Sequence, residues 1–278
     1  VTFKNPLGST EVNAVGGKAM NLFKLAGYGC SVPPFIALST ECFSGFVKSI
    51  ESKFNAALNG LKTDTPAAIA KSAAEIRSLF RAENIDKDLC AEILKAVKEN
   101  IGEGCYLSVR SSATTEDSKD FSYAGQLDSF LFRKTGPEIL EAVAGCWASG
   151  YSDRAVAYRA MKNISQREVK VAVVIQKMIN GSVSGVTFTV NPITSVHDEM
   201  LISAAYGLGE GLVSGELNSD QFICKKSGVI SIDRMEIASK KEKVVFNSEK
   251  GFGTIKEAVK DAECDTQCLT NQQALAVA

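Results

Sequence analysis

The segment SVRSSATTED at residues 108–117, followed by YAGQ at residues 123–126, marks the point where the character of the sequence changes. Residues 106–110 alternate between apolar and polar side chains, which predicts a strand. A second strand-like run, LDSFLF, begins at residue 127. The polar stretch between them is therefore predicted to be a loop held by two strands, with Arg110 at the end of the first.

Arg110 and this loop suit an anion. A guanidinium can bind two phosphate oxygens at once, and the loop hydroxyls and amides are further donors. Gly125 permits a close approach of the backbone before the next strand. The alternative is a polar surface loop in which Arg110 pairs with Glu116 or Asp117. The residues alone favour neither interpretation.

The sequence before this segment and the sequence after it differ in predicted secondary structure. Helical spacing of apolar residues predicts helices over about 18–25, 40–54, 64–80 and 86–101 before it, and from 137 towards 158 after it. Strand-like runs then begin at residues 169, 184, 199 and 221, and a turn at 226–228 leads into another. Because no regular alternation of strand and helix appears, the pattern predicts an α+β fold. We expect a mainly helical lobe over 1–172 and a sheet-rich lobe over 173–278.

The composition excludes several classes of protein. The 278 residues are 45% hydrophobic, and 31 basic against 32 acidic residues leave a charge of −1, which gives no indication of a nucleic-acid partner. The eight cysteines form no Cys-x-x-Cys pair and there is one histidine, so a structural zinc site is not expected. Unpatterned cysteines fit reduced thiols. No apolar run is long enough to span a membrane. These features predict a cytoplasmic protein.

A second candidate for phosphate binding is Gly16-Gly17-Lys18, at the start of a predicted helix. Glycines let the backbone approach a ligand, and a lysine near helix N–H groups favours phosphate. The segment is not a Walker A loop, because Val12 stands where the first glycine belongs and Ala19 where Ser or Thr would hold magnesium. The alternative is a flexible turn with a solvated lysine.

The glycine-rich stretch at residues 207–215 follows a predicted strand, yet it does not fit a dinucleotide fingerprint. Counted from Gly207, the third glycine of that pattern would fall at Leu212. A loop closing near a ligand or an irregular corner remains possible. Glu210 is a candidate metal or ribose contact, with a surface acid as the alternative. His197 lies in a turn-like stretch without a partner for a hydrolase triad.

Six blocks of the chain, in order, resemble the nucleotide-binding domain of phosphoenolpyruvate synthase and its relatives, which include rifampicin phosphotransferase and pyruvate phosphate dikinase. Their joint occurrence carries the resemblance, since no single block would. The blocks are VGGKAMNLFKLAGYGCSVPPF (15–35), SVRSSATTEDSKDFSYAGQLDSFL (108–131), CWASGYSDRAVAYR (146–159), VIQKM (174–178), GVTFTVNP (185–192) and GLGEGLVSGELNSDQF (207–222).

The resemblance implies an ATP-grasp-like fold, in which two lobes hold ATP in the cleft between them. It implies that Lys18 and Arg110 contact phosphates and act in phosphoryl transfer. Gly125 and Ser129 would line the loop that covers the phosphates, with Ser129 where many relatives have Thr. Gln176 would help to hold the adenosine end of the nucleotide.

The resemblance also implies the reaction. ATP and Mg²⁺ would serve as cofactors, and the β-phosphoryl group of ATP would pass to a carrier histidine on a separate domain and then to pyruvate, with AMP and phosphate released. The carrier and acceptor domains would lie in the same polypeptide or in a partner subunit. His197 does not fit the carrier motif. The alternatives are a rifampicin phosphotransferase-like enzyme or a nucleotide-binding module without turnover.

One departure from the family pattern concerns the metal. The family pattern continues beyond Ala278 into a segment with the main magnesium and phosphate ligands, so the metal ligands are not identified in this chain and Glu210 stays a weak candidate. Residues 271–278 look like part of a helix. We therefore expect a fragment without full activity.

Overall fold

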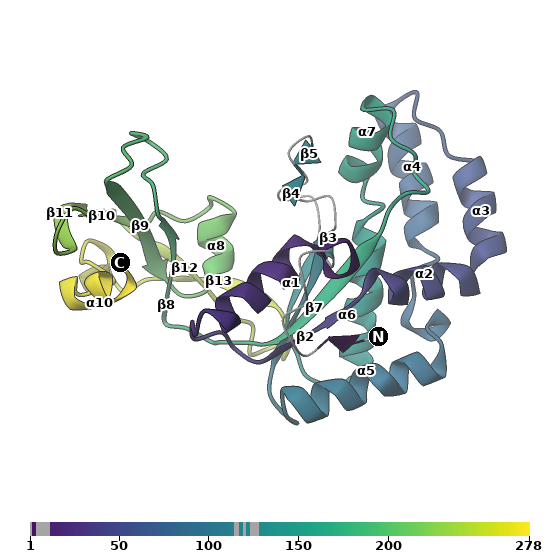
Figure 1. Ribbon diagram of the computed structural model, residues 1–278, viewed down its shortest axis with the longest axis horizontal. Helices are drawn as coiled ribbons and strands as arrows, with labels where there is room; N and C mark the ends of the chain where they lie inside the picture. Colours follow the sequence, from purple (N-terminus) through teal and green to yellow (C-terminus); the bar gives the residue numbers. More distant parts are fainter. Residues whose placement is uncertain (1, 4–11, 114–116, 119–120, 123–127) are drawn as a thin grey trace. The chain divides into compact units, whose positions relative to one another are not determined.

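The computed structural model describes residues 2–3, 12–113, 117–118, 121–122 and 128–278, and it divides into two compact units, residues 1–178 and 179–278. The mixture of helices and antiparallel sheets agrees with the predicted α+β class (Figure 1). The sequence predicted a division after residue 172. The structural division comes later because β7 (Val171–Lys177) pairs along its length with two strands of the first unit.

The first unit is built on a five-stranded sheet of order β1-β2-β7-β3-β6, in which every neighbouring pair is antiparallel. The last strand along the chain, β7, lies in the middle. The other strands are β1 (Thr2–Phe3), β2 (Phe35–Leu38), β3 (Leu107–Ala113) and β6 (Ser129–Arg133). A separate two-stranded antiparallel sheet is formed by β4 (Asp117–Ser118) and β5 (Phe121–Ser122).

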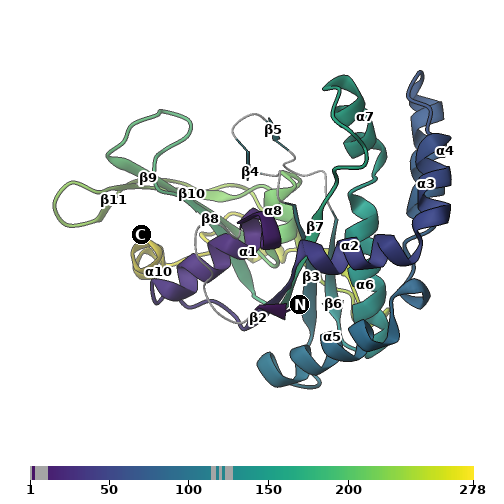
Figure 2. The same ribbon diagram turned by 45° about the vertical axis from the view of Figure 1, so that its right-hand side comes forward.

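Helices cover both faces of this sheet. One face packs against α1, through a small apolar cluster that includes Phe23, Ala37 and Val174. The other face carries the main core, in which Trp147 is fully buried against the rings of Phe43 and Phe46. Figure 2 shows α1 and α6 on either side of the strands. The helices are α1 (Val12–Gly27), α2 (Thr40–Ser49), α3 (Glu51–Asn59), α4 (Pro66–Arg77), α5 (Lys87–Asn100), α6 (Gly136–Ser149) and α7 (Asp153–Met161), with a 3₁₀ turn η2 (Ala82–Asn84).

Two predicted helices are each divided in the structure. The helix expected over 40–54 breaks at Ile50, whose φ of −111° and ψ of 15° end α2 before α3 begins. The helix expected from 137 towards 158 breaks between α6 and α7, where the Ser152 hydroxyl accepts a hydrogen bond from Ala155 N at 3.2 Å and starts a new helix. Apolar spacing continued across both breaks, so the pattern alone did not reveal them.

The second unit contains a four-stranded antiparallel sheet of order β11-β10-β9-β8 and a separate hairpin of β12 and β13. The strands β8 (Val183–Phe188), β9 (Glu199–Tyr206), β10 (Asp220–Lys225) and β11 (Ser231–Glu236) lie where the sequence predicted strands. The remaining elements are β12 (Glu242–Phe246), β13 (Thr254–Ala258), α8 (Gly209–Val213), α9 (Asp261–Cys264) and α10 (Asn271–Val277). The glycine-rich stretch at 207–215 therefore contains a short helix, α8, rather than only a loop or corner.

A buried ion pair ties together the polypeptide of the second unit. Lys240 Nζ lies 2.5 Å from Asp220 Oδ1, and both side chains are almost fully buried. Asp220 also accepts hydrogen bonds from the backbone N–H groups of Ala238 and Cys268. The pair thus holds β10, the segment before β12 and the segment before α10 to one point.

Candidate phosphate-binding site

The C-terminal half of β3 brings together several of the residues that the sequence singled out. Arg110 lies on β3 directly opposite Val174 of β7 and Ser129 of β6. Side chains that face each other across an antiparallel pair lie on the same side of the sheet. Val174 packs in the α1 cluster, so Arg110 and Ser129 lie on the α1 side. Both are exposed.

Lys18 reaches the same region from α1. It is half-buried, and its Nζ donates a hydrogen bond to the backbone oxygen of Ser111 at 3.1 Å. Burial, and then Asp128, raise the pKa of the buried Cys146 thiol, while Lys18 and Arg110 lower it. The Lys18 ammonium group thus lies beside the backbone of the residue that follows Arg110 on β3.

A kink in α1 makes this approach possible. Gly16 has φ 75° and ψ 168°. This backbone conformation is not helical, and residues other than glycine rarely adopt it. A Cβ at this position would lie 2.2 Å from the backbone oxygen of Ser112. The glycine is therefore required by both conformation and contact. The sequence pointed to Gly16 for ligand approach, whereas the structure shows it letting α1 approach β3.

Gln176 lies on the α1 side of the sheet as well, two residues along β7 from Val174, but its side chain is occupied. It is buried, and its Nε2 donates to the backbone oxygen of Pro33 at 3.1 Å. This bond joins β7 to the turn before β2. A role at the adenosine end of a nucleotide stays a prediction.

Gly125 and Glu116 lie outside the described residues, and the side chain of Asp117 is likewise not described. The predicted alternative, a surface loop with Arg110 paired to one of those acids, therefore stays open. Glu210 lies in the second unit, at the start of α8. It is exposed, and its Oε2 accepts a hydrogen bond from the Thr254 hydroxyl at 2.6 Å. His197 is exposed in the connection between β8 and β9.

The described residues contain neither a cluster of metal-binding side chains nor a helix that could span a membrane. In that part of the chain, no three His, Cys, Asp or Glu side chains gather where they would hold a metal ion. Magnesium is bound in proteins through one or two carboxylates together with water and substrate phosphates. Glu210 alone, bonded to a threonine, does not establish such a site. No helix in the described residues is long and apolar enough to cross a membrane.

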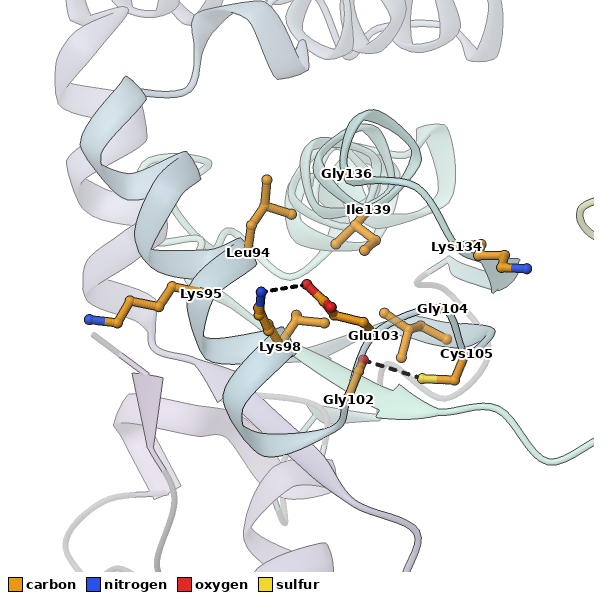
Figure 3. Close-up of a pocket in the computed structure, with 12 residues that line it drawn as sticks. Leu94, Lys95, Lys98, Gly102, Glu103, Gly104, Cys105, Lys134, Gly136 and Ile139 are labelled. Atoms are coloured by element: carbon orange, nitrogen blue, oxygen red, sulfur yellow. Dashed lines mark hydrogen bonds and ion pairs between the residues drawn. The ribbon is translucent and has the colours of Figure 1, made fainter.

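A cavity of about 520 Å³ lies elsewhere in the first unit, between α5, the turn after it and the start of α6 (Figure 3). Its apolar floor includes Leu107 and Ile139, which belong to the main core, on the opposite face of the sheet from α1. Lys98 and Glu103 form an ion pair of 2.7 Å at this cavity. Among the described residues, neither Lys18, Arg110 nor Ser129 lines it, so the cavity is separate from these cations.

Sequence reasoning missed the structural role of the two serines that follow Arg110. The hydroxyls of Ser111 and Ser112 were predicted to be donors to an anion, but both residues are fully buried and both hydroxyls bond to protein atoms. The available signal was their place inside a strand, since β3 extends to Ala113 rather than ending at Arg110.

Comparisons with known proteins cover nearly the whole chain. Residues 12–278 match the family described as pyruvate phosphate dikinase, AMP/ATP-binding domain. The chain is 32% identical to a probable phosphoenolpyruvate synthase of Methanocaldococcus jannaschii, over 98% of this chain and 23% of the relative. It is 32% identical to the phosphoenolpyruvate synthase of Pyrococcus furiosus, over 98% of this chain and 38% of the relative. It is 33% identical to the rifampicin phosphotransferase of Bacillus cereus, over 97% of this chain and 31% of the relative. The chain thus spans well under half the length of these relatives.

Proposed function

Since the chain belongs to the family of pyruvate phosphate dikinase AMP/ATP-binding domains, we propose that it binds the phosphates of ATP at the C-terminal half of β3, through Lys18 and Arg110. The observation that carries the proposal is that Lys18 of α1 bonds to the backbone of Ser111, next to Arg110 on β3 and on the face of the sheet where Arg110 lies. Ser129, opposite Arg110, adds a hydroxyl on the same side. Gly125, Gln176 and a magnesium ion are further parts of this proposal.

The chemistry that such a site supplies is positioning and charge stabilisation. Phosphoryl transfer spreads negative charge over the phosphate oxygens, and fixed cations lower the energy of that charge. In the proposed reaction, the β-phosphoryl group of ATP passes to a carrier histidine on another domain and then to pyruvate, with AMP and phosphate as products. The relatives named for phosphoenolpyruvate synthesis support pyruvate as the acceptor.

Titration calorimetry with ATP tests the binding site directly. Arg110→Ala should weaken ATP binding by at least about tenfold, because a hydrogen bond to a charged group contributes roughly 1.5–3 kcal/mol. Arg154→Ala is the matched control, since Arg154 is an exposed arginine on α7 of the same unit. We expect the control to bind ATP like the original chain. Equal affinities for all three proteins would show that Arg110 does not contact phosphate.

A second candidate function rests on the relative named rifampicin phosphotransferase, and a third is a nucleotide-binding module without turnover. ATP labelled at the β-phosphate separates them in the full-length gene product. Label in phosphoenolpyruvate when pyruvate is added supports the first proposal. Label in rifampicin supports the second. Tight ATP binding without release of AMP in either assay supports a module without turnover.

The proposal includes the ATP-grasp-like fold, with two lobes holding the nucleotide. Its support is that each unit combines an antiparallel sheet with helices. Photolabelling with 8-azido-ATP, followed by peptide mapping, is the test. Labelled peptides from both units are expected, and label confined to one unit would refute this arrangement.

A further inference from the structure

Two adjacent serines of β3 lie where the proposed phosphate-binding elements meet. Successive side chains of a strand point to opposite faces of the sheet. Ser111 and Ser112 therefore point to opposite sides, and each hydroxyl reaches a different neighbouring segment. Both residues are fully buried.

Ser112 holds the start of the regular part of α1. Its Oγ accepts a hydrogen bond from the backbone N–H of Ala19 at 3.2 Å. Because the chain is not helical at Gly16, Ala19 lies in the first turn after the kink, where N–H groups lack partners within the helix. A serine oxygen supplied from another element thus takes the place of a local N-cap. This bond fixes the backbone of α1 at Ala19, directly after Lys18.

Ser111 holds a different segment. Its Oγ donates to the backbone oxygen of Asp128 at 3.0 Å, and its backbone N–H donates to the same oxygen at 3.4 Å. Asp128 directly precedes Ser129, the residue opposite Arg110. The Ser111 hydroxyl therefore acts on the β6 side, while the Ser112 hydroxyl acts on the α1 side.

We propose that Ser112 is a positioning residue for ATP: by capping α1 through Ala19, it sets the place of the Lys18 ammonium group relative to Arg110. It does not contact the nucleotide. This inference rests on the proposed function, because it assumes that Lys18 binds phosphate. Gly16 is the second part of the same device, since only glycine leaves room for Ser112 against α1.

A double-mutant cycle on ATP affinity tests this role, measured by titration calorimetry on the full chain. Ser112→Ala should weaken ATP binding about fivefold, the size expected for loss of one helix cap. Lys18→Met should weaken it by about tenfold or more. If Ser112 acts through Lys18, then Ser112→Ala should cause no further loss in the Lys18→Met background.

Ser111→Ala is the matched control, because Ser111 is equally buried on the same strand and its hydroxyl bonds to Asp128 instead. Its effect on ATP affinity should be the same with or without Lys18. Thermal unfolding of each variant identifies losses that come from instability. Should Ser112→Ala fail to fold, the cycle is run with Ser112→Cys, which keeps a side chain of similar size but is a weaker acceptor.

The outcomes separate the inference from the function on which it rests. If Ser112→Ala costs as much in the Lys18→Met background as alone, the positioning role is wrong and the phosphate site stands. If Ser112→Ala alone leaves ATP affinity unchanged, the positioning role is also wrong. If Lys18→Met and Arg110→Ala both bind ATP like the original chain, the proposed function itself fails.

Discussion

Two sites, one in each unit, bury polar groups in different ways. At the end of β3, the buried groups are the neutral hydroxyls of Ser111 and Ser112, and the nearby cations Lys18 and Arg110 are half-buried and exposed. In the second unit, the buried groups are the charges themselves, since Lys240 and Asp220 are almost completely removed from solvent. At the first site, buried hydroxyls hold the segments that carry the exposed and half-buried cations. At the second site, the buried charges themselves hold chain segments together.

The difference follows from the cost of removing charge from water. A buried ion pair is tolerated when each ion is fully bonded, and loss of one partner leaves an uncompensated charge. The pair of Lys240 and Asp220 is therefore committed to the fold. Hydroxyls cost less to bury and can fix a backbone without neutralising the cations around it. The cations beside the buried hydroxyls of β3 therefore keep their charge and can receive an anionic ligand.

The largest effect is expected for Asp220→Ala, which leaves Lys240 buried without its partner and removes an acceptor from two backbone N–H groups. We expect a loss of about 3–5 kcal/mol in the free energy of unfolding of the second unit. Urea denaturation measures it. Asp233→Ala is the control, because Asp233 pairs with Lys225 at 2.9 Å on the surface, where such pairs contribute at most about 1 kcal/mol. Equal losses would contradict the comparison.

Gly16→Ala should have the next largest effect. The added Cβ meets the Ser112 backbone in a conformation with φ 75°, so we expect a loss of about 2–4 kcal/mol in stability and weaker ATP binding. Gly29→Ala separates the two causes, because Gly29 has φ 78° but nothing within 4 Å of its Cβ position. It should lose only about 1 kcal/mol. A Gly16→Ala variant no less stable than Gly29→Ala would show that the contact with Ser112 is not tight.

How much of this was predictable depends on the kind of interaction. Local signals located the starts of α4 and α5 near residues 64 and 86, where the side chains of Thr65 and Asp86 accept hydrogen bonds from the first turn of each helix. The predicted strand over 199–206 coincides with β9. The sequence also placed Arg110 and Lys18 together, but through the resemblance rather than through chemistry.

The parts that escaped prediction depend on distant segments. Ser112 caps a helix that lies far from it in the sequence, so no local pattern marks it as a cap. The bond from Gln176 to Pro33 and the ion pair of Asp220 with Lys240 are of the same kind. The strand β2, which pairs with β1 and β7, was also not predicted, because its four residues are too few to give a recognisable strand pattern.

Cysteine reactivity provides a smaller test of the same contrast. Cys30 is exposed, Cys146 is buried near the end of β3, and burial together with Asp220 raises the pKa of Cys268 to about 12. A thiol with a raised pKa has less of the reactive thiolate. Iodoacetamide at pH 8 should therefore modify Cys30 and spare Cys146 and Cys268, as measured by peptide mass spectrometry.

Asp220→Ala extends that measurement. Removal of the carboxylate lowers the pKa of Cys268 and loosens its segment, so Cys268 should become reactive while Cys146 stays protected. Equal reactivity of Cys146 and Cys268 in this variant would mean that the two units do not open separately.

Glu210→Gln should have the smallest effect. Its hydrogen bond with Thr254 is exposed, so we expect a change of less than about 1 kcal/mol in stability and no change in the dependence of ATP binding on Mg²⁺. Calorimetry with and without Mg²⁺ is the measurement. If the effect of Mg²⁺ disappears in the variant, Glu210 is a metal ligand after all.

The central place of β7 has a consequence for synthesis of the protein. On the ribosome, β2 and β3 emerge long before residues 171–177, which must enter between them. Until then both strands have an unpaired edge, a template for association with other chains. The helices of the first unit meanwhile have only separate strands on which to pack. The sheet of the first unit therefore closes in one late step of translation, and a chain interrupted before Val171 would carry two open edges that a chaperone must protect.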